Sequence, residues 1–321
     1  MRRFAAWLLV ALGGLAACQG PSGPRFTVQT WDGQAYSGAL ELEGDRLTVG
    51  RQRLRRDQVQ EAVLKIESGA RQAVAAIEGF QPLSAAALAG YRERAQAAVA
   101  KAPGAESVLC LDFGQETLTP DGKRSYRYHA LHLVLKDRGR KVGDLTLGFE
   151  EGRSRSQVFF ARAVAPDGAS RWLDPATLKV AVPSEEAQFL DTRGRVISGR
   201  VPGVDVDCFV EYAYEFLTYN PDVPDYFFPS FYFQSEEPFL DSIIDVLVPK
   251  GRKLNWATRN MPEKARQPQR SQRGAYDAYR WEMHDIPPFT PEPMMPSKND
   301  VVPAVHCSPF FDWNELHKRT G

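Results

Sequence analysis

Hydrophobic and polar residues alternate most regularly in the stretch from Val206 to Val248. Along Val206–Phe216 most apolar residues fall on one side of an extended chain, and carboxylates such as Glu211 fall on the other. A period of two predicts a β-strand with one face in water. Aromatic residues then crowd positions 226–233, and positions 241–248 alternate again. We interpret this stretch as the centre of an antiparallel β-sandwich.

Two earlier segments have different patterns. Residues 25–66 consist of short strand-like runs between turns such as Asp32-Gly33, which predicts a small curled sheet similar in outline to SH3-like or Sm-like units. An alanine-rich segment follows, in which apolar residues recur every three or four positions. Ser84 is suited to cap a helix there and Pro103-Gly104 is suited to end it, so this segment is predicted to be a helical connector.

From residue 105 onward, strand patterns follow one another, separated by turn signals at Pro120-Asp121-Gly122 and Pro166-Asp167-Gly168. The predicted fold class is therefore mainly β. The predicted limits are a signal peptide at 1–17, a lipidated tether at 18–24, a small β-barrel-like unit at 25–66, a helical connector at 67–104, a β-sandwich domain at 105–316 and a tail at 317–321.

The N-terminus has the pattern of a targeting segment. Two arginines precede the apolar run Phe4–Ala17, which is shorter than the ~18 residues expected of a membrane-spanning helix. The run ends in Leu15-Ala16-Ala17-Cys18, which resembles the lipobox of bacterial lipoproteins. The resemblance implies that Cys18 is acylated and anchors the chain to a membrane; the alternative is an ordinary cleaved signal with a chance cysteine. Gln19, in place of the aspartate that retains some lipoproteins on the inner membrane, favours the outer membrane, facing the periplasm.

Charge and cysteine content limit the partners, disulfides and cofactors that we expect. Basic and acidic residues number 40 each, which argues against a nucleic-acid partner, and we interpret the arginines at 51–56 as a solvated strand edge. Besides Cys18 the chain has Cys110, Cys208 and Cys307, which predicts either one disulfide and one thiol or three buried thiols. Cysteine and histidine show no metal-site spacing, and no phosphate or dinucleotide loop occurs, so we predict neither a metal nor a cofactor.

Three segments resemble one family: the hairpin at Asp121-Gly122 with its aromatic strand, the strand Val158–Gly168, and Pro202-Gly203 followed by Val206–Phe216. They are similar to DUF3857, a domain of unknown function that precedes transglutaminase-like cores in bacterial envelope proteins. Further matching motifs are Tyr279-Arg280-Trp281, Asp285-Ile286-Pro287, Glu292, Pro296, Val302-Pro303 and Phe311-Asp312-Trp313. The resemblance covers Glu106–Leu316 and implies a β-rich, non-catalytic module.

A transglutaminase-like core requires a cysteine thiolate, a histidine that takes its proton and a carboxylate that orients the histidine. We expect this core to be absent, because the late candidates are Cys307, His306 and His317 with Asp312 nearby, in a proline-bordered tail without a Gly-x-Cys helix start. We therefore predict no catalytic residue and interpret Cys307 as a packing thiol.

These patterns predict a lipid-anchored, non-catalytic envelope protein whose β-sandwich binds or scaffolds an envelope protein, a peptide or a glycan. Tyr226, Tyr232 and Phe233 form the candidate ligand strip; in the alternative interpretation their rings belong to the core between the sheets. The alternative function is that of a substrate-docking part of a transglutaminase or cysteine-peptidase-like system whose catalytic core is separate or lost.

Overall fold

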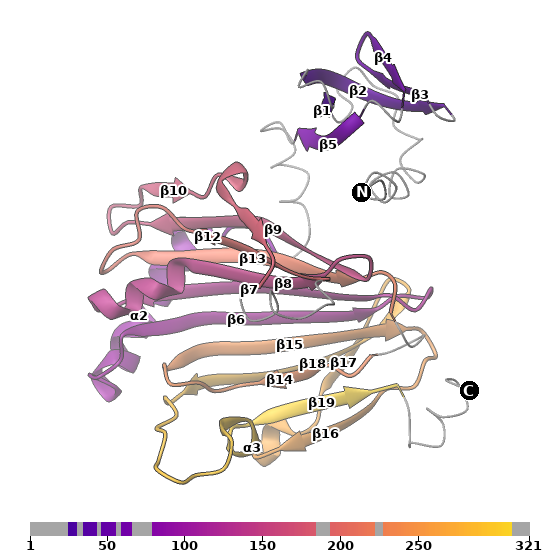
Figure 1. Ribbon diagram of the computed structural model, residues 1–321. Coiled ribbons are helices and arrows are strands. Elements are labelled where there is room, and N and C mark those ends of the chain that lie inside the picture. The colour runs from indigo at the N-terminus through magenta and orange to yellow at the C-terminus, as the bar shows by residue number, and fades with distance from the viewer. Residues whose placement is uncertain are drawn as a thin grey trace. The chain divides into compact units, whose positions relative to one another are not determined.

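The structure, a computed structural model, describes residues 25–30, 35–43, 46–55, 59–65, 79–183, 193–221 and 227–309 (Figure 1). The predicted signal peptide, the tether with Cys18 and the tail at 317–321 lie outside these ranges. The chain divides into two compact units, residues 1–76 and residues 77–321. Within the described ranges, no helix is both long enough and apolar enough to cross a membrane.

The first unit contains one antiparallel sheet, which confirms the prediction of short strands in this region. Its order is β4-β3-β2-β1-β5, so β1, β2 and β3 each pair with the next strand along the chain. The last strand returns to pair with the first. The strands are β1 (Arg25–Thr30), β2 (Ala35–Glu43), β3 (Arg46–Val49), β4 (Gln52–Arg55) and β5 (Val59–Lys65).

An eight-stranded sheet in the order β10-β9-β13-β7-β6-β15-β18-β17 forms the body of the second unit. Its strands are β6 (Ser107–Leu118), β7 (Arg124–Val134), β9 (Ser154–Val164), β10 (Ser170–Trp172), β13 (Phe209–Thr218), β15 (Phe239–Pro249), β17 (Gln269–Arg273) and β18 (Tyr276–Ile286). The hairpin between β6 and β7 turns at the predicted Pro-Asp-Gly. The predicted mainly β fold is confirmed, and the large sheet is mixed because β15 lies parallel to β6.

Two three-stranded sheets pack on one face of the large sheet, which makes the second unit a layered β structure. One has the order β11-β12-β8 and the other β14-β19-β16. Alternate residues of β15, namely Ile244, Val246 and Val248, pack with residues of the second small sheet such as Val305. The strands are β8 (Asp144–Glu150), β11 (Lys179–Ala181), β12 (Gly194–Arg200), β14 (Ser230–Tyr232), β16 (Asn255–Arg259) and β19 (Ala304–Ser308). Short 3₁₀ turns at Asp137–Gly143, Pro175–Thr177 and Glu263–Ala265, and helix α3 (Lys298–Val301), join them.

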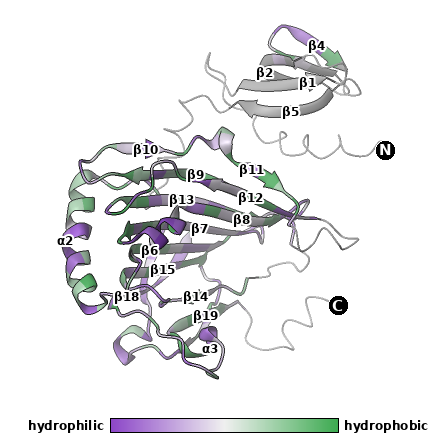
Figure 2. Ribbon diagram, turned by 60° about the vertical axis from the view of Figure 1, so that its left-hand side comes forward, coloured by the Kyte–Doolittle hydropathy of each residue, from purple (hydrophilic) through white to green (hydrophobic). Residues whose placement is uncertain are grey.

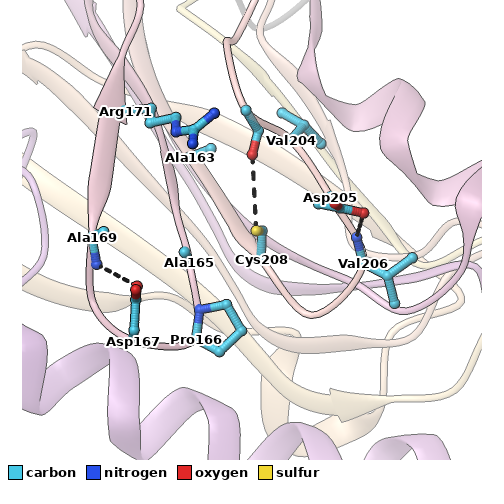
Figure 3. A pocket seen from close by; sticks show the side chains of 11 residues that line it. Ala163, Ala165, Pro166, Asp167, Ala169, Arg171, Val204, Asp205, Val206 and Cys208 are labelled. Atoms are coloured by element: carbon cyan, nitrogen blue, oxygen red, sulfur yellow. Dashed lines mark hydrogen bonds between the residues drawn. The ribbon is translucent and has the colours of Figure 1, made fainter.

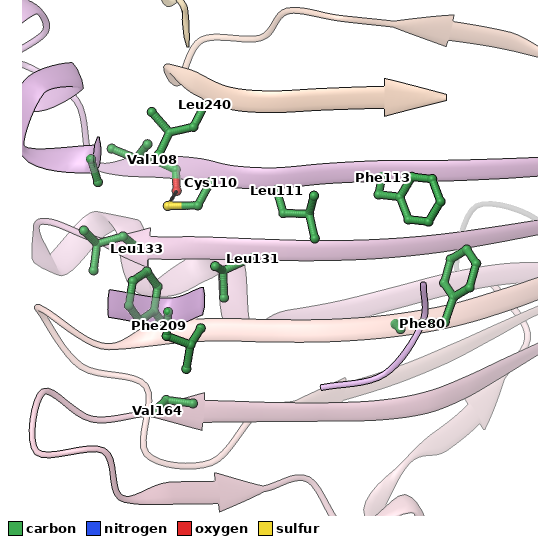
Figure 4. Close-up of a cluster of buried hydrophobic side chains, with 13 residues drawn as sticks. Phe80, Val108, Cys110, Leu111, Phe113, Leu131, Leu133, Val164, Phe209 and Leu240 are labelled. Atoms are coloured by element: carbon green, nitrogen blue, oxygen red, sulfur yellow. Dashed lines mark hydrogen bonds between the residues drawn. The ribbon is translucent and has the colours of Figure 1, made fainter. Parts of the chain in front are cut away.

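Helix α2 (Ala85–Lys101) covers part of the opposite face of the large sheet (Figure 2). As predicted, Ser84 caps it by accepting a hydrogen bond from the Ala87 N–H, and the helix ends before Pro103. Leu88 and Ala95 are buried in the main core cluster, where Phe80 stacks on Phe113 with ring centroids 5.1 Å apart (Figure 4). The helix is therefore part of the larger unit rather than a connector, and the units divide near residue 76.

The face of β13 that was predicted to lie in water is buried instead. Glu211 is fully buried between the sheet and the segment that leads into α2. The carboxylate accepts hydrogen bonds from the Leu83 N–H at 2.7 Å and from the Arg162 Nε–H at 2.7 Å, and it lies 2.9 Å from His129 Nε2. A period of two shows that the two faces of a strand differ, but it does not show whether the polar face meets water or a buried cation.

Cys110, Cys208 and Cys307 are all free and buried. The structure therefore matches the second of the two predicted arrangements, three buried thiols. Burial raises the pKa of the Cys110 thiol well above its usual value, because the loss of water outweighs the backbone hydrogen bond at Leu133 and the charge of Arg94.

Candidate functional site

A row of four tyrosines lies on the face of the large sheet that also carries the two small sheets. Tyr126 and Tyr128 come from β7, and Tyr212 and Tyr214 come from β13. In each pair the residues are two apart, so both rings of a pair project from the same face. Because Tyr214 is directly opposite Tyr128 in the antiparallel register, the two pairs are adjacent.

The four rings contact one another and remain half-buried. Ring centroids are 5.4 Å apart for Tyr128 and Tyr214, 6.1 Å for Tyr126 and Tyr128, and 6.5 Å for Tyr212 and Tyr214. Burial raises the pKa of Tyr214 to about 12, and it raises the pKa values of the other three further. The phenols therefore keep their protons at neutral pH and can donate hydrogen bonds.

Asp112 of β6 lies beside this tyrosine row. Its Oδ1 accepts a hydrogen bond from the Tyr128 hydroxyl at 2.7 Å, and its Oδ2 accepts one from the Ser242 hydroxyl at 2.6 Å. Asp112 is only 5% exposed. Burial raises the pKa of its carboxyl group to about 6, because the two hydrogen bonds compensate only in part for lost hydration. This group would therefore change its charge close to neutral pH.

His132 and Glu237 extend the polar part of the same face. The His132 ring stacks on Tyr212 with centroids 6.0 Å apart, and its Nδ1 lies 3.4 Å from Glu237 Oε2. The Ser107 hydroxyl donates to the same carboxylate at 2.6 Å. Burial acts to raise the pKa of Glu237, but the charge of His132 and the hydrogen bonds from His132 and Ser107 outweigh it and hold that pKa below its usual value.

This face combines flat apolar rings, phenol donors and carboxylates. Tyrosine rings offer large contact areas with few rotatable bonds, which is why they are common in surfaces that bind other molecules. Among the described residues, no three histidine, cysteine or acidic side chains are grouped closely enough to hold a metal ion. The chemistry that the arrangement supports is noncovalent binding.

The structure describes two of the three residues of the predicted ligand strip, Tyr232 and Phe233. Phe233 is fully buried in the core between β15 and the second small sheet, as in the alternative interpretation. Tyr232 is half-buried, with its ring edge-on to His306 at 6.0 Å, and Tyr226 lies outside the described residues. The signal in the sequence that could have identified the tyrosine row is the repeat Tyr126-x-Tyr128 and Tyr212-x-Tyr214.

Cys307 and His306 do not form a catalytic pair. Cys307 and His306 are neighbours on β19, so their side chains point to opposite faces. Cys307 is 4% exposed in the core, and burial raises the pKa of its thiol to about 12. His306 instead lies 2.8 Å from the Ser230 hydroxyl and 3.1 Å from Arg259; burial and this cation lower its pKa. His317 and Asp312 lie outside the described residues.

A pocket of about 350 Å³ lies beside the turn that joins β9 to β10 (Figure 3). Its two carboxylates are already used by local turns: Asp167 accepts from the Ala169 N–H, and Asp205 accepts from the Val206 N–H and pairs with Arg140. The Cys208 thiol, which also lines the pocket, lies 3.9 Å from the Gly203 carbonyl oxygen. These groups form turns rather than a reactive arrangement.

The described residues form a β-rich domain with a row of tyrosines on one sheet face. The profile of the family described as a Domain of Unknown Function with a solved structure, DUF3857, matches residues 120–290. The chain belongs to this family. The match includes all four tyrosines but starts after Asp112. No curated protein matches the sequence.

A solved structure shares the fold. A candidate protease from Parabacteroides distasonis is similar with a TM-score of 0.58 and 14% identity, over 64% of this chain and 40% of that protein. An M1 zinc metallopeptidase from Deinococcus radiodurans has a TM-score of 0.29 and 6% identity, over 63% of this chain and 42% of that protein. The chain therefore spans less than half the length of these proteins, and at such identities the first likeness shows the fold alone.

Proposed function

We propose that this chain is a lipid-anchored, non-catalytic module of the bacterial envelope that binds an extended segment of another envelope protein on its tyrosine row. The observation that carries the proposal is the set of four contacting, half-buried tyrosines on one sheet face. Such rings lose little conformational entropy on binding, because each side chain has only two rotatable bonds.

The polar groups on and beside the tyrosine row favour a peptide as the ligand. Glu237, with a side chain 23% exposed, can accept a backbone N–H donor, and the phenols of Tyr126 and Tyr214 can donate to backbone carbonyl groups. The rings would supply the apolar contact that places these hydrogen bonds in a partly dry environment, where they are stronger. An extended chain lying across β7 and β13 would meet these groups in turn.

Replacing Tyr214 with serine tests this function, because Tyr214 contacts the three other rings and has no hydrogen bond in the described part of the chain that its loss would break. We expect binding of the partner to weaken by about tenfold or more, as for an aromatic residue at the centre of an interface. Crosslinking in living cells with quantitative mass spectrometry measures the yield of the partner. Tyr276→Ser, a half-buried tyrosine on β18, is the matched control. Equal yields of crosslinked partner from both variants would rule out the tyrosine row as the binding site.

Anchoring through Cys18 is the second part of the proposal. The Cys18→Ser variant is expected to lose its acyl chains and leave the membrane fraction, because each buried methylene group of a chain contributes about 0.8 kcal/mol to membrane binding. Cell fractionation and intact-mass measurement of the mature chain check this. A variant that stays fully membrane-bound, or a wild-type chain without added lipid mass, would contradict it.

A second candidate is a substrate-docking role beside a separate catalytic chain. It is favoured by the likeness to part of a candidate protease, of which this chain spans 40%. In that case the peptide on the tyrosine row would be a substrate, and the crosslinking experiment above would recover a peptidase together with it.

A further inference from the structure

An open pocket of about 410 Å³ lies where β16 meets β17 and β18, on other residues than the tyrosine row. The volume falls within the range of about 300–1,000 Å³ that is typical of small-ligand sites. It is lined by Lys253, Leu254, Asn255, Trp256, Arg270 and Tyr279.

Two aromatic rings form a rigid wall of this pocket. Trp256 and Tyr279 have ring centroids 5.9 Å apart, and both contact Trp281, at 6.0 Å and 6.5 Å. Trp281 is only 1% exposed, so it supports the two half-buried rings from the core. Rings that are held in place before a ligand arrives lose little entropy when it binds.

Arg270 supplies a positive charge at the same wall. Its guanidinium group lies 5.0 Å from the centroid of Trp256 and 5.6 Å from that of Tyr279. No carboxylate in the described part of the chain forms an ion pair with it, whereas Arg273 pairs with Asp245 and Arg259 with Asp300. A guanidinium group that lies over aromatic rings can still donate its N–H groups to a carboxylate.

The sequence around the pocket is strongly basic, although the whole chain has no net charge. Between positions 250 and 273 the acidic residue is Glu263. The basic residues of this segment are Lys250, Arg252, Lys253, Arg259, Lys264, Arg266, Arg270 and Arg273. A local excess of one sign attracts ligands of the opposite sign.

We propose that this pocket binds an acidic saccharide, with one sugar ring against Trp256 and Tyr279 and its carboxylate on Arg270. Among the lining residues Leu254 alone is aliphatic, and it is 4% exposed, so the pocket offers little to an apolar side chain. The flat rings suit the C–H face of a sugar, and Asn255 and Lys253 suit its hydroxyl groups. The openness of the site to solvent on one side allows the saccharide to continue beyond the bound ring.

Isothermal titration calorimetry of the full chain with hexagalacturonic acid tests the proposal. We expect measurable binding to the wild-type chain, and binding about tenfold or more weaker for Arg270→Gln, which removes the charge of an exposed residue. Arg138→Gln, with a side chain 88% exposed on a distant turn, is the matched control and should bind as the wild type does.

Two further ligands separate the contribution of the carboxylate charge from that of the sugar rings. The methyl ester of hexagalacturonic acid, which keeps the rings but lacks the charges, should bind about tenfold or more weakly than the acid. A hexaglutamate peptide should also bind about tenfold or more weakly. Equal binding of the ester or the peptide would overturn the assignment to an acidic saccharide, as would undetectable binding of the acid or an equal loss in Arg138→Gln. Failure of this test would not affect the function proposed for the tyrosine row, because the two sites share no residue.

Discussion

Replacing Glu211 with alanine is expected to lower the free energy of unfolding by about 3–5 kcal/mol, because it leaves the buried Arg162 guanidinium group without its counter-charge and removes a hydrogen-bond partner of His129. The Glu211 side chain is 0% exposed, and those of His129 and Arg162 are 2% and 10% exposed. Arg162 Nη2 also donates to the Leu83 carbonyl oxygen at 2.7 Å, and His129 Nδ1 lies 3.1 Å from the Gly79 carbonyl oxygen. The same group of residues therefore fixes the segment before α2 to the sheet.

Denaturant unfolding of the full chain, followed by tryptophan fluorescence, measures this effect. Glu150→Ala is the matched control, because Glu150 pairs with Arg153 at 3.3 Å with a half-exposed side chain, and exposed pairs contribute about 0–1 kcal/mol. A Glu211→Ala variant as stable as Glu150→Ala would show that the buried charges do not hold the segment.

Replacing Asp112 with asparagine is expected to stabilise the protein at neutral pH by up to roughly 3 kcal/mol. The folded-state pKa of about 6 lies above the usual value of 3.8 for an aspartate, so the native state holds its proton where the unfolded state has lost it. This neutral form contributes stability that is fully present below about pH 4 and is lost as the pH rises through 6. Asparagine can keep both hydrogen bonds without the buried charge, by accepting from Tyr128 and donating to Ser242.

Denaturant unfolding measured between pH 4 and pH 8 checks the direction of this change in stability with pH. The stability difference between Asp112→Asn and the wild type should grow from about pH 4 to about pH 6 and then level off. Asp144→Asn, which changes an exposed carboxylate on β8, should follow the wild type across this range. A difference that shrinks with rising pH would show that Asp112 is charged in a compensated environment and that hydrogen bonding dominates there.

Much of the fold follows from local patterns that depend on neighbouring residues. Ser84 caps α2 as predicted, and the hairpin turn at Asp121-Gly122 joins β6 and β7 as predicted, because caps and tight turns are determined within a few residues. The parallel pairing of β15 with β6 joins segments about 130 residues apart in the sequence. Strand patterns do not specify such a partner.

The candidate site was harder to predict for the same reason. Tyr232 and Phe233 lie in an aromatic run that attracts attention in the sequence, yet Phe233 is buried because β14 packs onto the large sheet. Tyr128 and Tyr214 are 86 positions apart, and only the register of β7 and β13 makes them neighbours. The pKa of Asp112 likewise depends on burial by several strands, which no single stretch of sequence shows.

The proposed function requires that the tyrosine row contacts another envelope protein. A photoreactive amino acid at position 214 of the full chain, activated by light in intact cells, measures this most directly. We expect one discrete crosslinked protein that is missing when the same residue is placed at the exposed position 138. The same yield and the same products from both positions, or no product from position 214, would contradict it.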